Sequence, residues 1–334
     1  MPVGNSQVLD WLNSMNISRS SKAFAEEVNA GLSAPQKCLS SKYFYDAKGD
    51  VLFQKIMQLP EYYLTRAEFD ILEQYREEIL QPLLSLRAPF NLIEMGAGDG
   101  LKTRLLLTYL YERKALFTYY PIDISGNVLE QLRAGLAKEY PGLSVEPIQG
   151  TYHEALEENR WNREQPSLML FLGSNIGNFR EGEALGLLDD IARTLGPDDL
   201  LLAGFDLKKD PEVILKAYND SQRVTRDFNL NLLYRINREL GGNFDPDKFK
   251  HWPVYDPMSG ECKSYLVSME KQSVHIAALN STFEFDEYEA VFMEVSKKYG
   301  LSELEQYAQQ MGFEILRHFM DAQGYFTDSL WRKR

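Results

Sequence analysis

From residue 90 onward, short apolar runs alternate with amphipathic stretches along the chain. The runs "FNLIEMG", "FTYYPIDIS", "LSVEPIQG", "SLMLFLGSNIGN" and "DLLLAGFDL" are predicted to be five strands. Between them, "LKTRLLLTYLYER", "NVLEQLRAGLAKEY" and "GEALGLLDDIARTL" carry apolar residues at helical spacing. This alternation predicts an α/β fold with a doubly wound parallel sheet, whose ligands bind at the carboxyl ends of the strands.

The two flanks of this region differ from it. Residues 1–66 look helical with little strand signal, and Pro60 separates two predicted helices. After Asp206 the alternation stops: residues 211–240 read as helices, strand-like pieces follow, and the tail predicts a helix and two strands that return to the sheet. We therefore expect a core of residues 67–208 plus 299–334, and a second domain of residues 1–66 plus 209–298.

Composition and charge narrow the class of protein. The chain has 334 residues, of which 44% are hydrophobic, and a formal net charge of −13, which disfavours a nucleic-acid partner. No stretch approaches the roughly 18 apolar residues that span a bilayer, and the N-terminus lacks a signal-peptide pattern. The two cysteines are far apart and the four histidines show no metal-ligand spacing. We expect a cytoplasmic protein without a metal, a membrane or a nucleic acid.

The stretch "NLIEMGAGDG" places Gly96, Gly98 and Gly100 directly after a predicted strand. A dinucleotide-binding turn needs its last glycine where this chain has Leu101, so that fingerprint fails. The observed spacing, followed by Lys102, is typical of S-adenosylmethionine sites, where the backbone wraps the amino-acid end of the cofactor.

An acidic residue supports a nucleotide site. The second predicted strand ends at Asp123, 27 residues after Gly96. A carboxylate at this position can accept hydrogen bonds from both ribose hydroxyls. Its position favours a nucleotide but does not separate methyl transfer from hydride transfer.

Three further stretches resemble one enzyme family. They are "FYDAKGDVLFQKIMQLPEYYLTRAE", "FLGSNIGNF" and "FMEVSKKY", and the segment that begins "AGFDLKKD" is similar as well. Together they look like the histidine-specific Nα-methyltransferases of ergothioneine biosynthesis, with a resemblance that covers about Lys42 to Trp331. The first stretch is the most specific of the three.

The resemblance implies both a fold and an activity. The family uses S-adenosyl-L-methionine to methylate the α-amino group of L-histidine three times, which gives histidine betaine (hercynine). Its fold is a Rossmann-type methyltransferase core with a second substrate-binding domain, built from the N-terminal helices and an insertion. We expect a monomer that takes L-histidine as its small-molecule partner.

The resemblance also assigns site residues. Gly96, Gly98, Lys102, Asp123 and the pair Thr151-Tyr152 fall at cofactor positions, although the family has Asp-Phe where this chain has that pair. The positions implied for the substrate are Tyr45, Phe53, Tyr62, Gly173, Asn178, Tyr218, Glu294 and Ser296. Asn178 orients the amine and Tyr62 contacts it or a nearby water, and Glu294 with Ser296 grips the imidazole.

One departure from the family bears on specificity. Ser264 aligns where histidine-specific members carry a methionine beside the imidazole ring, which implies a roomier and more polar pocket. Retention of Glu294 still favours an imidazole, because a carboxylate facing an apolar side chain would be buried unpaired at about 1–3 kcal/mol or more. Another amino acid, or a ring nitrogen of histidine, remains open as the acceptor.

Methyl transfer from a sulfonium is an in-line displacement that needs an unprotonated amine and correct positioning. The aromatic residues Tyr45, Phe53 and Tyr62 suit a quaternary ammonium product, at about 0.5–2 kcal/mol per contact. Two other classes remain as alternatives: a dehydrogenase, against which Leu101 argues, and a binding module without catalysis.

Overall fold

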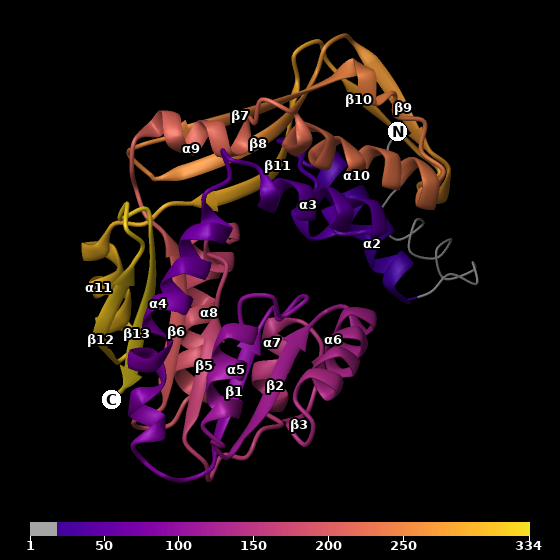
Figure 1. Cartoon of the computed structure of the whole chain (residues 1–334). Helices are drawn as coiled ribbons and strands as arrows, with labels where there is room; N and C mark the ends of the chain where they lie inside the picture. Colours follow the sequence, from indigo (N-terminus) through magenta and orange to yellow (C-terminus); the bar gives the residue numbers. More distant parts are fainter. Residues whose placement is uncertain (1–18) are drawn as a thin grey trace. The chain divides into compact units, whose positions relative to one another are not determined.

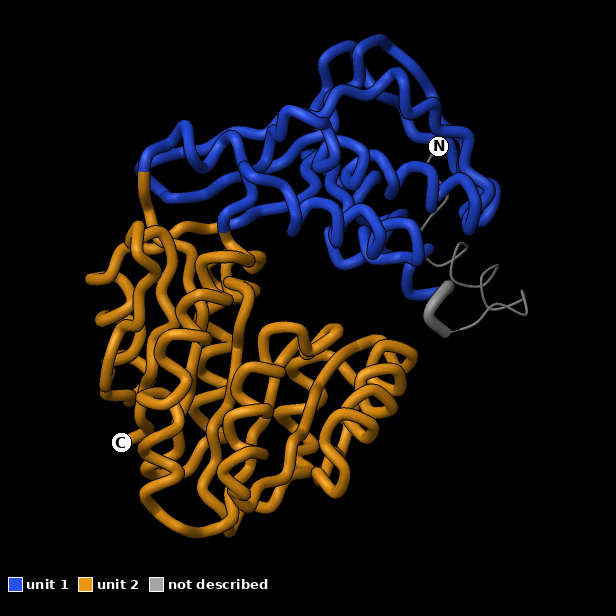
Figure 2. The backbone as a smooth tube through the Cα atoms, viewed as in Figure 1, with its two compact units in different colours: residues 1–63, 210–296 blue, residues 64–209, 297–334 orange. Residues whose placement is uncertain are grey.

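The computed structural model describes residues 19–334, so the predicted helical character of residues 1–18 lies outside the described part (Figure 1). The chain divides into two compact units, which Figure 2 colours separately: Met1–Tyr63 with Asp210–Ser296, and Leu64–Lys209 with Lys297–Arg334. The sequence placed the corresponding boundaries at 66/67, 208/209 and 298/299. We call these units unit 1 and unit 2 and describe each by itself.

Unit 2 contains a sheet of eight strands in the order β12-β13-β6-β5-β1-β2-β3, with β4 also paired to β2. Its strands are β1 (Phe90–Met95), β2 (Phe117–Asp123), β3 (Ser144–Val145), β4 (Ile148–Gln149), β5 (Ser167–Phe171), β6 (Leu200–Asp206), β12 (Phe313–Met320) and β13 (Phe326–Lys333). Strands β1 to β6 pair in parallel, and β13 pairs antiparallel with both β6 and β12. The predicted α/β fold with a doubly wound sheet is confirmed.

Helices cover both faces of this sheet. They are α4 (Leu64–Leu84), α5 (Arg104–Glu112), α6 (Gly126–Glu139), α7 (Tyr152–Glu158), α8 (Glu181–Thr194) and α11 (Leu301–Gln310). One face packs on α4, α5 and α6 through residues such as Leu92 and Leu170, and the other packs on α7, α8 and α11 through their neighbours Ile93 and Phe171. Because successive residues of a buried strand face opposite sides, the almost continuous apolar runs follow from this double coverage.

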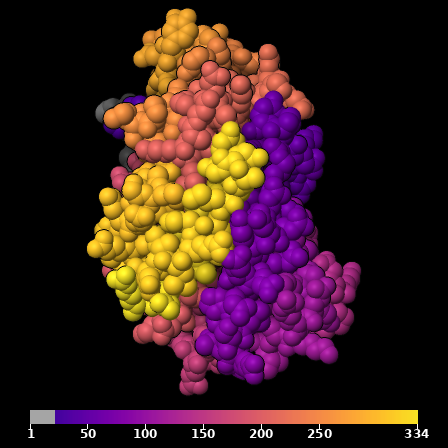
Figure 3. Space-filling model, turned by 60° about the vertical axis from the view of Figure 1, so that its left-hand side comes forward, coloured from indigo at the N-terminus to yellow at the C-terminus, as the bar shows by residue number. Residues whose placement is uncertain are grey.

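The C-terminal strands pack beside α4. Figure 3 shows the purple segment that includes α4 next to the yellow C-terminal part of the chain. The ring centroids of Tyr75 in α4 and Phe319 in β12 are 5.3 Å apart. The helix also contacts β13, the strand that separates β12 from β6. The predicted return of the tail to the sheet is confirmed.

Two local predictions differ from the structure. The stretch "LSVEPIQG" forms the two short strands β3 and β4 instead of one, because Pro147 between them lacks a backbone N–H for the ladder. Helix α7 was not predicted, since it has only seven residues.

Unit 1 combines helices with two small antiparallel sheets, β11-β8-β7 and β10-β9. Its helices are α2 (Arg19–Ser33), α3 (Ala47–Gln58), α9 (Pro211–Tyr218) and α10 (Val224–Leu240). Its strands are β7 (Phe249–Asp256), β8 (Glu261–Ser268), β9 (Gln272–Ile276), β10 (Ser281–Phe285) and β11 (Ala290–Lys297, whose last residue belongs to unit 2). Short 3₁₀ helices occur at η1 (Ser41–Phe44), η2 (Asn175–Asn178, in unit 2), η3 (Pro246–Lys248) and η4 (Ala277–Leu279).

The core of unit 1 joins segments that are distant in sequence. Phe24 and Val28 of α2, Phe44 of η1, Phe228 of α10 and Leu266 of β8 belong to one buried cluster. Helix α10 ends at Leu240, and the following Gly241 forms its left-handed cap with a φ of 64°. The insertion therefore folds together with the N-terminal helices.

Candidate active site

The glycine turn after β1 forms the first part of the candidate site. Gly96, Gly98 and Gly100 all have positive φ, at 73°, 54° and 66°, which side chains disfavour. A Cβ on Gly96 would lie 2.6 Å from the Tyr152 hydroxyl oxygen, whereas a Cβ on Gly98 would meet nothing within 4 Å. The turn is therefore closed at Gly96 and open above Gly98, where a ligand can approach the backbone.

Asp123 at the end of β2 holds the turn in place. Its carboxylate accepts a hydrogen bond from the Gly98 amide at 3.1 Å and another from the Ser125 amide at 2.9 Å. The side chain is half-buried, so part of it remains accessible. The structure thus brings the predicted ribose-binding acid to the predicted glycine turn.

Thr151 and Tyr152 begin helix α7. The Thr151 hydroxyl donates to the Glu154 carboxylate at 2.8 Å and accepts from the Glu154 amide at 3.3 Å, so Thr151 is the N-cap of a capping box. Tyr152 packs against Phe171 at the end of β5. Burial, together with the negative charges of Asp123 and Glu94, raises the pKa of Tyr152, so its hydroxyl keeps its proton beside Gly96.

The loop after β5 carries the motif "GSNIGN". Ser174 adopts a left-handed φ of 54° and its hydroxyl accepts from the Asp206 amide at 3.0 Å, which fixes an unfavourable backbone conformation. A Cβ on Gly177 would lie 2.8 Å from the Lys297 carbonyl oxygen, so only glycine allows this approach. Asn178 ends the loop and is exposed, and its side chain is accessible to a ligand.

Lys102 joins the glycine turn to the "GSNIGN" loop through Glu68 of α4. The Lys102 ammonium forms an ion pair with Glu68, which also accepts the Gly173 amide at 2.6 Å. A Cβ on Gly173 would lie 3.3 Å from Lys102 Nζ. Sequence reasoning identified Lys102 and Gly173 but missed Glu68, although its place on the apolar face of α4, between Leu64 and Leu72, was a detectable signal.

Glu94, the acidic residue of β1, carries a second buried carboxyl group that, like that of Glu68, was not predicted. It accepts hydrogen bonds from the hydroxyls of Thr103 and Tyr119. Burial raises the pKa of Glu94 to about 7, against the opposite effect of these two donors. The carboxyl ends of β1, β2 and β5 therefore meet a polar network with several carboxyl groups and one lysine.

In unit 1 the predicted aromatic residues form one cluster. The Phe53 ring lies 5.5 Å from Tyr45 and 6.5 Å from Tyr62, between ring centroids, and the contacts are edge-on. Phe228 of α10 contacts both Tyr45 and Phe53 and was missed by the sequence analysis. Tyr45 is 42% exposed, so the cluster offers accessible aromatic surface.

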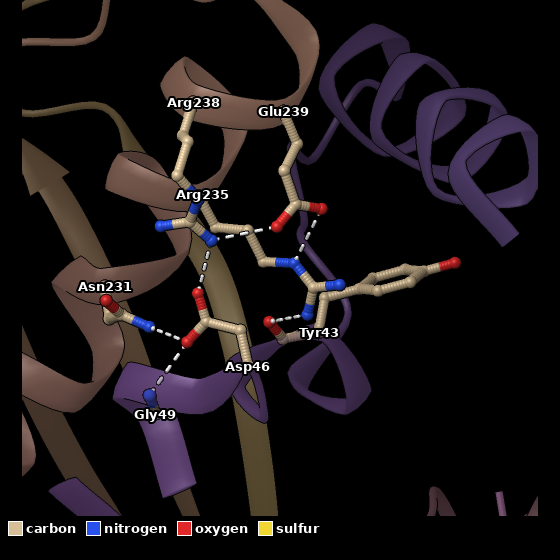
Figure 4. A network of polar contacts seen from close by, with 7 residues as sticks. All are labelled: Tyr43, Asp46, Gly49, Asn231, Arg235, Arg238 and Glu239. Carbon is tan, nitrogen blue, oxygen red and sulfur yellow. Dashed lines mark hydrogen bonds and ion pairs between the residues drawn. The ribbon is translucent and has the colours of Figure 1, made fainter. Parts of the chain in front are cut away.

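A polar network holds this aromatic segment on α10 (Figure 4). Asp46 caps α3 by accepting the Gly49 amide at 2.8 Å, and it also binds the Asn231 amide group at 2.8 Å and Arg238 at 2.5 Å. The Arg235 guanidinium donates to the Tyr43 carbonyl at 3.0 Å. Since Tyr45 precedes Asp46 directly, the network fixes the position of the aromatic cluster.

Two of the residues predicted to bind the substrate, Tyr218 and Ser296, are in contact in unit 1. The hydroxyl of Tyr218, at the end of α9, donates to the Ser296 hydroxyl at 2.7 Å. Glu294 lies two residues before Ser296 on β11 and is half-buried. The structure thus joins Tyr218 to the strand that carries the predicted imidazole-binding residues.

Ser264 has a histidine as its neighbour. It is buried on β8, and its hydroxyl lies 3.4 Å from Nε2 of His251 on β7. Burial lowers the pKa of His251 to about 4, so this imidazole is neutral at physiological pH. The four histidines show no metal-ligand spacing in the sequence, and no local signal placed His251 beside Ser264.

Residues 19–334 contain neither a metal-ligand cluster nor a membrane-spanning helix. No cluster of three or more histidine, cysteine, aspartate and glutamate side chains within this range has the arrangement of a metal site. Within the same residues, no helix is both long and apolar enough to cross a membrane.

Comparison with known proteins identifies relatives over nearly the whole chain. A family model described as histidine-specific methyltransferase, SAM-dependent, matches residues 24–333. The histidine N-alpha-methyltransferase of Mycolicibacterium smegmatis is 34% identical over 322 residues, which cover 96% of this chain and 98% of that protein. The enzyme of the same name from Mycobacterium tuberculosis is 36% identical, over 93% of this chain and 95% of that protein. Ergothioneine biosynthesis protein 1 of Schizosaccharomyces pombe is 31% identical over 84% of this chain, which corresponds to 37% of that longer protein.

Proposed function

Because the chain belongs to the family of histidine-specific, S-adenosylmethionine-dependent methyltransferases, we propose that it methylates the α-amino group of L-histidine. Three successive transfers would give the trimethylated betaine, hercynine. The observation that carries this proposal is the meeting of the glycine turn, Asp123 and the Gly173–Asn178 loop at one edge of the unit 2 sheet.

The residues at this edge fit the cofactor. The open space above Gly98 allows the backbone to approach the amino-acid end of S-adenosylmethionine, and the Lys102 ammonium can bind its carboxylate. Asp123 can accept the ribose hydroxyls, and Thr151 retains one lone pair for the adenine amine. When bound, the cofactor supplies an electrophilic methyl group on a sulfonium.

The protein's part in the reaction is to position an unprotonated amine. Asn178 has a side-chain oxygen that can accept an N–H of the α-amine and so direct its lone pair. We assign the Tyr62 hydroxyl of unit 1 to the same amine or to an intervening water. Neither group must be a strong base, because the free amine can be selected from solution.

The aromatic cluster of unit 1 suits the charge of the product. As methyl groups are added, the amine becomes a quaternary ammonium, which the faces of Tyr45, Phe53 and Tyr62 attract by about 0.5–2 kcal/mol each. We assign Tyr218 to the substrate carboxylate, and Glu294 with Ser296 to the imidazole. Support for this assignment is the hydrogen bond that links Tyr218 to Ser296.

Ser264 affects which amino-acid side chain the substrate pocket accepts. The buried pair of Ser264 and neutral His251 is more polar than the methionine expected from the family. A different amino acid, or methylation of a ring nitrogen, is therefore the second candidate.

The test is calorimetric titration of L-histidine with and without S-adenosylhomocysteine, followed by mass spectrometry of a turnover mixture. We expect binding and products that carry one, two and three methyl groups on the α-nitrogen. Asn178→Ala should lower kcat by about a hundredfold or more. Tyr62→Phe should also lower kcat, and by more than the control change Tyr234→Phe at an exposed tyrosine of α10. If another amino acid or a ring nitrogen of histidine is methylated instead, histidine Nα is not the acceptor.

We also propose that the protein acts as a monomer in the cytoplasm and without nucleic acid. The net charge of −13 opposes binding to phosphates, and the chain's two cysteines, Cys38 and Cys262, form no disulfide. Size-exclusion chromatography with light scattering tests the oligomeric state.

A further inference from the structure

Glu68 lies at the centre of a buried network that none of the assigned roles explains. Its side chain is 1% exposed. One carboxylate oxygen accepts the Gly173 amide at 2.6 Å, and the other binds the Lys102 ammonium. A single carboxylate thus joins the two segments that are proposed to hold the cofactor and the substrate amine.

A second carboxyl group lies against the first. Asp328 of β13 is fully buried, and neither of its oxygens receives a hydrogen bond from any donor among the described residues. It pairs across the sheet with Gly204 of β6, and a Cβ on Gly204 would collide with Glu68 Oε1 and lie 3.1 Å from Asp328 Oδ1. Only glycine at position 204 leaves room for the two carboxyl groups to approach each other.

The charges require one of these carboxyls to be neutral. Burial and the neighbouring charge of Glu68 raise the pKa of Asp328 well above its usual range, whereas Glu68 keeps a cationic partner in Lys102. A neutral Asp328 can donate its proton to Glu68 Oε1, since two carboxyls in contact share a proton when they cannot both ionise. Glu68 then has donors from three directions and cannot rotate freely.

We propose that Glu68, held by Asp328 beside Gly204, is a positioning residue that fixes the Lys102 ammonium and the Gly173 amide at the amino-acid end of the cofactor. This inference rests on the cofactor site of the proposed function and does not depend on which amino acid is methylated. Glu68 acts through Lys102 and Gly173, which contact the ligand.

The test compares two ligands that differ at the amino-acid end. S-adenosylhomocysteine carries that end, and 5′-methylthioadenosine lacks it. Glu68→Gln should weaken S-adenosylhomocysteine binding about tenfold or more, the loss expected for one charge-assisted contact, and leave 5′-methylthioadenosine binding unchanged. Glu73→Gln, at an exposed position of the same helix, is the control and should change neither.

A second pair of variants tests the role of Asp328. Asp328→Asn keeps a hydrogen-bond donor toward Glu68 and should retain S-adenosylhomocysteine affinity, whereas Asp328→Leu removes the donor and should weaken it. Equal loss of both ligands in Glu68→Gln, or no loss of either, overturns the proposal. Equal behaviour of the two Asp328 variants overturns the part assigned to Asp328. If the variants show these effects while the wild-type protein does not methylate histidine, the positioning role stands and the proposed acceptor fails.

Discussion

His251 offers a sharp test of the electrostatics of unit 1. Its imidazole is 7% exposed on β7 and lies beside the Ser264 hydroxyl. Burial lowers its pKa from 6.5 to about 4; the charge of Asp220 opposes this shift and that of Arg226 adds to it. The Asp220 carboxylate accepts the amides of Val224 and Thr225 at 2.8 Å, which fixes its position at the start of α10.

The sign and size of the effect on stability follow from linkage. The native state resists protonation of His251 and the unfolded state does not, so the unfolded state binds more protons between pH 6.5 and about 4. The free energy of unfolding therefore falls as the pH drops through this window. With these two pKa values, the loss between pH 8 and pH 5 is about 2 kcal/mol.

Two measurements check this value. Chemical-shift titration of the four histidines, with His251→Gln to assign the signal, should show His251 titrating near pH 4. Urea unfolding at pH 8 and pH 5 should show a loss in wild type that exceeds the loss in His251→Gln by about 2 kcal/mol. A His251 titration near 6.5, or the same pH dependence in both proteins, would refute the argument.

Two further predictions concern the carboxyl groups of Asp46 and Glu94. Asp46→Ala should lower the free energy of unfolding by about 2–4 kcal/mol, because it removes the cap of α3 and leaves the buried amide of Asn231 without its partner; a loss in urea unfolding below 0.5 kcal/mol would contradict the role of the network in Figure 4. Glu94 has a raised pKa of about 7, so the native state holds its proton more tightly and stability falls as the pH rises from 4.5 to about 7, by about 3 kcal/mol. Glu94→Gln should remove this decline in unfolding experiments at pH 5 and pH 8, and an unaltered decline would show that Glu94 is ionised throughout.

Much of the unit 2 fold could be predicted because its signals are local. Strands β1, β2, β5 and β6 are apolar runs bounded by turns, and the turn after β1 contains three glycines that need positive φ. The resemblance also identified residues such as Lys102 and Gly173, which the structure brings together. Helix α7 was missed, although Thr151 and Glu154 form the capping-box pattern that marks its start.

The buried carboxyl network could not be predicted, because its contacts join distant parts of the chain. Glu68 and Asp328 are 260 positions apart and meet only when β13 pairs with β6 beside α4. Both faces of β13 are covered, so the alternation of polar and apolar residues along the strand does not show which acid is buried. The pairing of Ser264 with His251 has the same cause, because it depends on the register of β7 against β8.

The position of β13 also has a consequence for how the protein is made. This strand comes from residues 326–333 yet lies inside the sheet, between β12 and β6. Unit 1 likewise needs β11, which ends at Lys297, to complete its three-stranded sheet. During synthesis on the ribosome, β6 must therefore wait with an unpaired edge while about 120 further residues are added, a state that favours aggregation. The methyltransferase core is complete only once β13 has been made, and a chaperone that shields the edge of β6 until then would raise the yield of folded protein.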